Sequence, residues 1–337
     1  MAYVGPMSPS APGTPKRAAV VYNPIKVDRD RLRAAVAVAE SENGWAKSIW
    51  LETTEEDPGH GLASRAVAQK VDMVIAAGGD GTVRAVGAGL RGTGIALALL
   101  PSGTGNLLAR NLGLDVNANH LEASVSAAFS GSDSAIDMGV IEIDRPDGST
   151  EEHAFLVMAG LGLDAKMIAN TDPELKKKVG WLAYVGAIGR VLVDKEVLRL
   201  RYRLDGGPER VSRVHTILVG NCGSLPGNIL LLPDAELDDG LFDIVTLRPE
   251  GFGGWARIWV GIIWENGVLR RSSAGRKLLN LRSKQVRALR YLRGRQLHVD
   301  LDRPEEFELD GDEFGTIVGF RAHVDPASLI VRMPAES

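Results

Sequence analysis

Two glycine-rich runs carry the clearest chemical signal in this chain. Residues 78–82 read GGDGT, and residues 102–106 read SGTGN. Glycines accept positive φ angles and let backbone N–H groups approach a phosphate without a Cβ in the way. Thr82 would open a helix whose N-terminal N–H groups favour an anion, and Asp80 could orient these donors or attract a metal. Two such loops side by side could cradle a triphosphate, whereas either run alone could equally be a tight turn.

Two acidic runs could supply other parts of a phosphoryl-transfer site. Residues 308–313 read ELDGDE, and residues 236–241 read ELDDGL. Phosphoryl transfer to an alcohol needs a group that accepts the hydroxyl proton, and a carboxylate of the first run could do this. Carboxylate and carbonyl oxygens suit Mg²⁺, which the second run could bind. The alternatives are a solvated acidic turn for the first run and a β-turn with glycine at its tip for the second.

Short apolar runs would position the glycine-rich turns. Strands are predicted at residues 18–22, 48–51, 71–77 and 95–100, with helices at residues 29–40 and 61–70. Strand, turn and helix in this order, with short connections, predict an open parallel sheet covered on both faces. Ligands of such sheets bind at the carboxyl ends of the strands, which is where the polar turns fall.

The pattern changes after about residue 137. Strand-like segments separated by turns follow at residues 139–144, 153–159, 198–204, 214–220 and 241–247. The clearest helical stretch among them is residues 173–194. We therefore predict a second, largely antiparallel domain. The expected organisation is a flexible tail at residues 1–16, a first domain at 17–138 and a β-rich domain at 139–330, whose last residues could return to the first domain.

The bulk properties narrow the class of protein. The chain has 337 residues, 45% of them hydrophobic, and a net charge of −4 that gives no general attraction to nucleic acid. Its single cysteine, Cys222, permits no internal disulfide, which fits a reducing compartment. The six histidines have no zinc-ligand spacing. We expect neither a signal peptide nor a membrane-spanning helix.

Taken in order, these motifs resemble the diacylglycerol kinase catalytic-domain family, which includes bacterial lipid kinases and sphingosine kinases. The resemblance covers nearly the whole chain from about residue 17. The matching segments are residues 22–24 (YNP), 78–82, 101–106 with Ala109 and Arg110, 160–165 (GLGLDA), Gly180 with Ala183 and Tyr184, 238–240 (DDG), and 310–311. The GGDGT run alone is shared with NAD kinases, but the ordered set is specific to the lipid kinases.

The resemblance implies a fold and a nucleotide site. The fold would be an NAD-kinase-like, doubly wound α/β domain followed by an antiparallel β-sandwich, with ATP bound between them. The implied ATP-binding residues are Asn23, Pro24, Ile25, Lys26, Val27, Thr54, Gly78, Gly79, Asp80, Gly81, Thr82, Val83, Arg84, Gly103, Thr104, Gly105 and Asn106. Thr54 is preferred over Thr53 because Glu55 follows it, as in the family pattern. Ile25 and Lys26 replace the usual Ser-Gly, and Lys26 could contact phosphate.

The resemblance also assigns the acidic residues. It implies that Asp310 and Asp312 take part in catalysis together with Asp80, with Asp312 at the position of the family's proton acceptor. The family carries a glutamate there, so the acceptor side chain of this chain is one methylene shorter. A structural Mg²⁺ is implied at Asp239, with the carbonyls of Glu236 and Leu241 as further ligands. A second Mg²⁺ would arrive with ATP.

The predicted function is an ATP-dependent lipid kinase, with diacylglycerol as the favoured acceptor and phosphatidic acid as the product. The alternatives are an NAD kinase-like enzyme, or a catalytically weak, lipid-sensing relative. Residues 251–299 combine three tryptophans with a dense basic run, and residues 176–185 join three lysines to an apolar segment. The first segment favours an anionic membrane surface over nucleic acid, although it could instead pack on the second domain. We expect a cytoplasmic protein peripheral to the inner face of the membrane, and a possible homodimer.

Overall fold

The computed structural model describes residues 14–162, 197–225, 229–248 and 289–335. Several predictions fall outside these described residues. They are most of the tail at residues 1–16, the helix at 173–194, residues 163–165 of the GLGLDA motif, Gly180, Ala183 and Tyr184, the basic-apolar segment at 176–185, and residues 251–288 of the basic segment.

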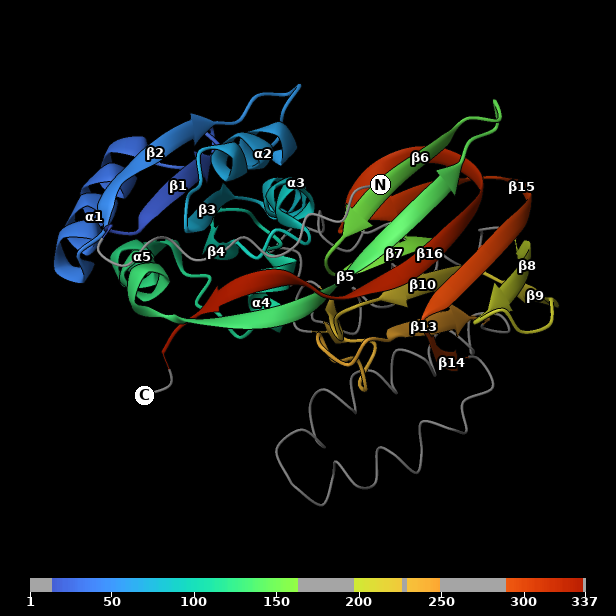
Figure 1. Ribbon diagram of the computed structural model, residues 1–337. Coiled ribbons are helices and arrows are strands. Elements are labelled where there is room, and N and C mark those ends of the chain that lie inside the picture. The colour runs from blue at the N-terminus through green and yellow to red at the C-terminus, as the bar shows by residue number, and fades with distance from the viewer. Residues whose placement is uncertain (1–13, 163–196, 226–228, 249–288, 336–337) are drawn as a thin grey trace, which may run out of the picture.

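The first part of the chain is a parallel sheet with helices on both faces. Its strands are β1 (Arg17–Tyr22), β2 (Ala46–Glu52), β3 (Met73–Gly78) and β4 (Ala96–Pro101), in the order β4-β3-β1-β2. Its helices are α1 (Arg29–Asn43), α2 (His60–Ala68), α3 (Asp80–Leu90), α4 (Leu107–Asn111), the 3₁₀ helix η1 (Ala118–His120) and α5 (Leu121–Ser130). Figure 1 shows α1 and α5 on one side of the sheet and α2 and α3 on the other.

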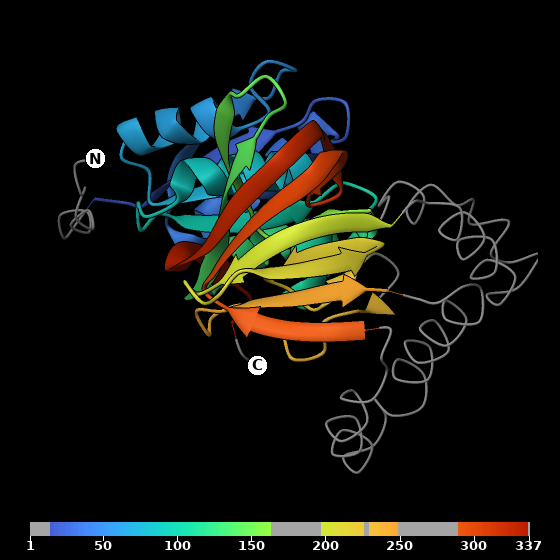
Figure 2. The same cartoon turned by 90° about the vertical axis from the view of Figure 1, so that its right-hand side faces the viewer.

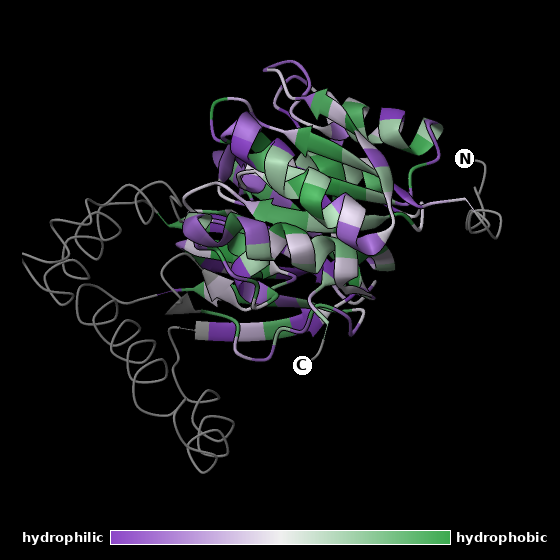
Figure 3. Cartoon of the chain, turned by 90° about the vertical axis from the view of Figure 1, so that its left-hand side faces the viewer, coloured by the Kyte–Doolittle hydropathy of each residue, from purple (hydrophilic) through white to green (hydrophobic). Residues whose placement is uncertain are grey.

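Alternation along the buried strands explains this double covering. In β1, Val20 faces the core with α1 and α5, whereas its neighbours Ala19 and Val21 face the core with α2 and α3. Because side chains of a strand point alternately to opposite faces, a fully apolar strand needs cover on both sides. Figure 3 shows these hydrophobic strands behind helices whose surfaces mix polar and apolar residues.

The second part is antiparallel. Its strands are β5 (Ser132–Asp144), β6 (Thr150–Phe155), β7 (Met158–Leu161), β8 (Leu198–Leu204), β9 (Arg210–Val214), β10 (Thr216–Gly220), β11 (Ser224–Leu225), β12 (Ile229–Leu230), β13 (Phe242–Leu247), β14 (Leu289–Gly294), β15 (Gln296–Leu309) and β16 (Asp312–Met333). Figure 2 shows these strands side by side, next to the α/β part. They enclose a core that contains Phe155, Phe242, Phe307 and Phe320. The rings of Phe155 and Phe242 stack with centroids 5.5 Å apart.

Two long strands join the parts into one sheet. β5 runs without interruption across residue 138, and β16 pairs with it along most of its length. At Val331, β16 also meets Leu97 of β4 on its other edge. The pairing of β5 with β16 slips between Asp325 and Leu329. At this irregularity the buried Asp137 carboxylate accepts N–H bonds from Ala327 (2.8 Å) and Gly240 (2.6 Å).

The predicted fold class, a doubly wound α/β part followed by an antiparallel β-rich part, is confirmed. No helix within the described ranges combines the length and apolar character needed to span a bilayer.

Candidate active site

The turns after β1, β3 and β4 meet at the carboxyl edge of the parallel sheet. The Asn23 N–H donates to the Ala77 carbonyl at 2.9 Å, and the Ser102 N–H donates to the Gly78 carbonyl at 2.9 Å. Each turn is thus bonded to the end of strand β3. The structure therefore brings together three of the segments that the sequence marked for nucleotide binding.

The two glycine-rich loops approach each other more closely than side chains would allow. A Cβ on Gly103 would lie 2.8 Å from the Gly79 Cα, and a Cβ on Gly79 would lie 2.8 Å from the Lys26 Nζ. Gly79 is the N-cap of α3 and makes no side-chain cap bond. The first turn of α3 thus combines a helix N-terminus with a nearby ammonium, an arrangement that suits a phosphate.

A cavity of about 300 Å³ opens beside these loops. Its lining includes Lys26 and Gly103, together with residues of α1 and of the segment 115–118. The cavity gives a ligand on the loops room to extend along the α1 side of the sheet.

Asp80 ties the start of α3 to the start of α4. Its Oδ1 accepts the Leu107 N–H at 2.5 Å, and its Oδ2 accepts the Asn106 N–H at 2.9 Å. Burial raises the pKa of Asp80, while these backbone donors oppose the rise and nearby Asp312 adds to it. Asn106 has a left-handed backbone (φ 48°) and holds Gly103 through two side-chain bonds of 2.8 and 2.9 Å. Asp80 therefore shapes the second loop.

The other nucleotide-binding candidates are spread around these loops. The exposed Thr54 bonds with Asp57 through both its N–H and its hydroxyl, and Thr53 is buried. The Ile25 side chain is 92% exposed. A Cβ on Gly105 would lie 2.6 Å from Asp80 Oδ2, so Gly105 permits the Asp80 contact. Of the remaining candidates, Thr82 and Val83 are buried in α3, and Thr104 is exposed at the tip of the second loop.

The acidic run near the C-terminus forms the hairpin turn between β15 and β16. Leu309 pairs with Asp312, and the two residues between them, Asp310 and Gly311, have φ angles of 50° and 86°. Asp-Gly with two positive φ angles is the combination that a type I′ hairpin turn favours. This turn brings Asp312 from the β-rich part against the first turn of α3.

Asp310 and Asp312 have different surroundings although they flank one glycine. Asp310 is buried, and its carboxylate accepts N–H bonds of 2.8 to 2.9 Å from Leu156, Val157 and Met158. Burial raises the pKa of Asp310, opposed by Arg84 and by these backbone donors. The Asp312 side chain is 50% exposed. Of the two carboxylates, Asp312 is the one that a substrate can reach.

Asp312 lies against the first turn of α3. A Cβ on Gly81 would be 2.9 Å from Asp312 Oδ2, and the Arg84 guanidinium donates to the same oxygen at 2.8 Å. Arg84, which was predicted to bind nucleotide, places its guanidinium against the β15–β16 hairpin. The three acidic catalytic candidates thus have distinct surroundings: Asp80 starts α3 and bonds to the second loop, Asp310 is buried in the hairpin turn, and Asp312 is half exposed beside α3.

The acidic turn at residues 236–241 is ion-paired with an arginine side chain. Asp239, the side-chain ligand implied for Mg²⁺, accepts the Leu241 N–H through Oδ1 (2.9 Å) and is ion-paired with Arg293 through Oδ2. Arg293 also lies 3.3 Å from Asp243, whose pKa burial raises to about 6. Among the described residues no group of three or more His, Cys, Asp or Glu is arranged as a metal site. Since Arg293 takes the place of a cation here, these residues do not fit Mg²⁺ in this arrangement, and Mg²⁺ at this turn stays a prediction.

Sequence reasoning missed two contributors to the region: Asp137, which joins the 236–241 turn to the bulge of β16, and Arg293, which pairs with Asp239. It named Arg84 as a nucleotide-binding candidate but did not foresee its contact with Asp312. An acidic residue within the apolar run 136–141 was a usable signal for Asp137, because a buried carboxylate needs partners. The two arginines gave no local signal, since their partners are distant in sequence.

Comparison with known proteins places the chain in a family. The family model named diacylglycerol kinase catalytic domain matches residues 17–141. The chain is 32% identical over 231 residues to a Pseudomonas aeruginosa protein named probable lipid kinase YegS-like, covering 68% of this chain and 71% of that protein. We conclude that the chain belongs to the diacylglycerol kinase catalytic-domain family, which confirms the resemblance read from the motifs.

Two further comparisons add to this assignment. The chain is 34% identical over 189 residues to the diacylglycerol kinase of Mycobacterium tuberculosis, covering 56% of this chain and 59% of that protein's length. A solved structure described as a diacylglycerol kinase from Bacillus anthracis matches with a TM-score of 0.64 at 20% identity, covering 94% of this chain and 96% of that one. The structural match supports the fold alone.

Proposed function

We propose that this protein is an ATP-dependent kinase that phosphorylates a lipid hydroxyl, with diacylglycerol as the acceptor and phosphatidic acid as the product. The observation that carries the proposal is the position of Asp312. This half-exposed carboxylate from the β-rich part lies at the first turn of α3, next to the two glycine-rich loops. A proton acceptor beside an anion-binding helix start is the arrangement that phosphoryl transfer to an alcohol needs.

In this proposal the loops bind the phosphates of ATP. Backbone N–H groups at the start of α3 would contact phosphate oxygens, and Lys26, close to Gly79, would balance part of their charge. Mg²⁺ bound with ATP would neutralise further charge on the phosphates. Asp80 would keep the second loop in place through its bonds to Asn106 and Leu107.

Asp312 would accept the proton of the substrate hydroxyl. The hydroxyl oxygen attacks the γ-phosphorus as its O–H bond breaks, the bond from the γ-phosphorus to the bridging oxygen breaks, and ADP leaves. Asp310 would act on this step indirectly. Its three backbone bonds hold the turn that presents Asp312.

The choice of diacylglycerol rests on the relatives. The Mycobacterium tuberculosis protein is named a diacylglycerol kinase, whereas the Pseudomonas aeruginosa protein is named only a lipid kinase. We further propose that the protein acts in the cytoplasm as a peripheral protein of the inner membrane face, because a lipid kinase must take its acceptor from a bilayer. We also propose that the protein can form a homodimer.

Transfer of labelled phosphate from Mg²⁺-ATP to candidate acceptors in mixed micelles tests the function. The panel should contain diacylglycerol, monoacylglycerol, ceramide, a sphingoid base, phosphatidylglycerol and NAD⁺, each with wild type and with Asp312→Asn. We expect labelled phosphatidic acid from wild type alone. Another labelled phospholipid would keep the chemistry and replace the acceptor. Labelled NADP⁺ would favour an NAD kinase, and ATP binding without any product would favour a lipid sensor.

A further inference from the structure

Arg84 connects α3 to the hairpin that carries Asp312. Its Nη1 donates to the Leu309 carbonyl at 2.6 Å, and its Nη2 donates to Asp312 Oδ2 at 2.8 Å. The guanidinium carbon lies 4.6 Å from the centroid of the Phe314 ring. These partners are more than 200 positions away in sequence, and all three belong to strands β15 and β16.

The guanidinium is held on its edge and on its face. Its planar fork gives one N–H to a main-chain carbonyl and another to a carboxylate, while the ring of Phe314 covers its plane. Phe314 is itself fixed, because its ring packs edge-on against His153 (4.9 Å) and its carbonyl accepts a bond from Arg145. The Arg84 side chain is only 14% exposed. Few other positions are therefore open to it.

This contact uses only one of the two carboxylate oxygens of Asp312. Arg84 binds Oδ2, and within the described part of the chain no hydrogen bond or ion pair engages Asp312 Oδ1. A carboxylate held through one oxygen has a fixed orientation and keeps the other for a substrate proton. An aspartate reaches less far than a glutamate, so a fixed orientation matters more for it.

We infer that Arg84 is a positioning residue that holds the Asp312 carboxylate over the first turn of α3, so that Oδ1 faces the acceptor hydroxyl. The inference rests on the proposed kinase function and adds a residue to that site. It gives Arg84 a role besides the one that the motif predicted. Two of its five N–H donors are used by Leu309 and Asp312, so nucleotide binding through the others stays a prediction.

Steady-state kinetics and nucleotide binding of Arg84→Gln and Arg84→Lys test the inference. The control is Arg91→Gln, which removes a cation at the end of the same helix, where Arg91 pairs with Glu152 (3.4 Å) and Asp325 (3.6 Å). We expect Arg84→Gln to lower kcat by about 10²-fold, since a misplacement of about 1 Å costs this much. The Kd and KM for ATP should change less than about twofold. Arg84→Lys should recover part of kcat, because it keeps the charge but not the fork.

The possible outcomes separate this inference from the proposed function. An active wild type whose Arg84→Gln variant keeps kcat overturns the inference alone, as does a variant that loses ATP affinity with kcat intact. An equal loss of kcat in Arg91→Gln would also overturn it, because the effect would then be general to the helix. A wild type that phosphorylates no acceptor removes the proposed function and the inference together. The melting temperatures of Arg84→Gln and Arg84→Lys, both expected near that of wild type, exclude misfolding as the cause of a lower kcat.

Discussion

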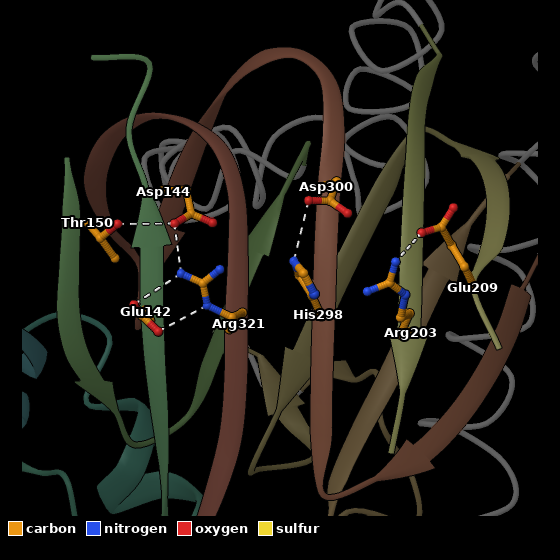
Figure 4. Close-up of polar contacts among 8 residues, drawn as sticks. All are labelled: Glu142, Asp144, Thr150, Arg203, Glu209, His298, Asp300 and Arg321. Atoms are coloured by element: carbon orange, nitrogen blue, oxygen red, sulfur yellow. Dashed lines mark hydrogen bonds and ion pairs between the residues drawn. The ribbon is translucent and has the colours of Figure 1, made fainter. Parts of the chain in front are cut away.

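Two regions of this protein carry many charged side chains, and they are built differently. On the outer face of the β-rich part, Arg321 bonds with Glu142 and Asp144 at 3.0 to 3.1 Å, and Arg203 bonds with Glu209 at 2.6 Å (Figure 4). At the candidate active site, the charged groups are positioned instead by close glycine contacts, by a left-handed asparagine and by a type I′ turn.

The charged pairs on the outer face are positioned by regular strand pairing. Glu142 and Arg321 are direct partners in the pairing of β5 with β16, and both side chains are almost half exposed. A groove of about 410 Å³ crosses this face, and its charged lining residues are already paired: Glu142 with Arg321, Arg203 with Glu209, and Glu152 with Arg91. Exposed pairs of this kind contribute about 0–1 kcal/mol each. A high density of charged side chains therefore does not by itself indicate a functional site. An irregular backbone that brings backbone N–H donors and charged side chains to one point is the better indicator.

The largest expected effect is that of Asp312→Asn. Loss of the proton acceptor should lower kcat by about 10²- to 10⁴-fold while ATP affinity changes less than about twofold. Initial rates in the mixed-micelle assay and calorimetric titration with ATP measure the two quantities. A variant with near-wild-type kcat would contradict the assignment of Asp312.

Asp310→Asn should act on stability. An amide offers one acceptor oxygen where the carboxylate accepts three N–H bonds, so buried donors are left without partners at a cost of about 2–4 kcal/mol. Urea unfolding measures this loss. Asp312→Asn is the matched control in the same hairpin and should change stability by less than about 1 kcal/mol. Equal losses in both variants would refute the contrast between the buried and the open carboxylate.

Gly103→Ala should separate the two loops. Its Cβ would lie 2.8 Å from the Gly79 Cα, a backbone atom that cannot move aside alone. We expect ATP affinity to fall about tenfold or more, since the phosphate site depends on both loops. Gly207→Ala, in the β8–β9 hairpin, is the control. Unchanged binding in Gly103→Ala would show that close loop approach is not required.

Arg293→Gln should leave the acidic turn without its cationic partner. Without Arg293, Asp239 and Asp243 have no positive partner among the side chains that pair with them here, and stability should fall by about 1–3 kcal/mol. Mg²⁺ should then raise the melting temperature of the variant more than that of wild type. If chelation lowers the melting temperature of wild type instead, Mg²⁺ already binds this turn.

The smallest effect is expected for Arg321→Gln on the outer face. Its ion pairs are exposed, so unfolding free energy should change by less than about 1 kcal/mol and kcat should not change. The difference in melting temperature between variant and wild type should be small at low salt and smaller still at high salt. A large loss of activity would give the outer face a role that its paired charges do not suggest.

Much of the fold followed from local sequence. Fully apolar runs such as residues 18–22 predicted buried strands, and the turns after them predicted a site at the carboxyl edge. The structure confirmed the parallel sheet and the antiparallel part. Residues 78–82 and 102–106 were expected to lie side by side, and the Gly79–Gly103 approach brings them together.

The sequence by itself determined the buried strands of the first part and the glycine-rich turns after them, because each depends on dihedral preferences and periodicity within a few residues. Only the tertiary structure decided that Asp310 is buried while Asp312 faces α3, and that Arg84 holds Asp312 across 228 positions. These outcomes depend on how β15 and β16 pair and return to the first sheet. Long-range pairing of that kind leaves no periodic signal near the residues it brings together.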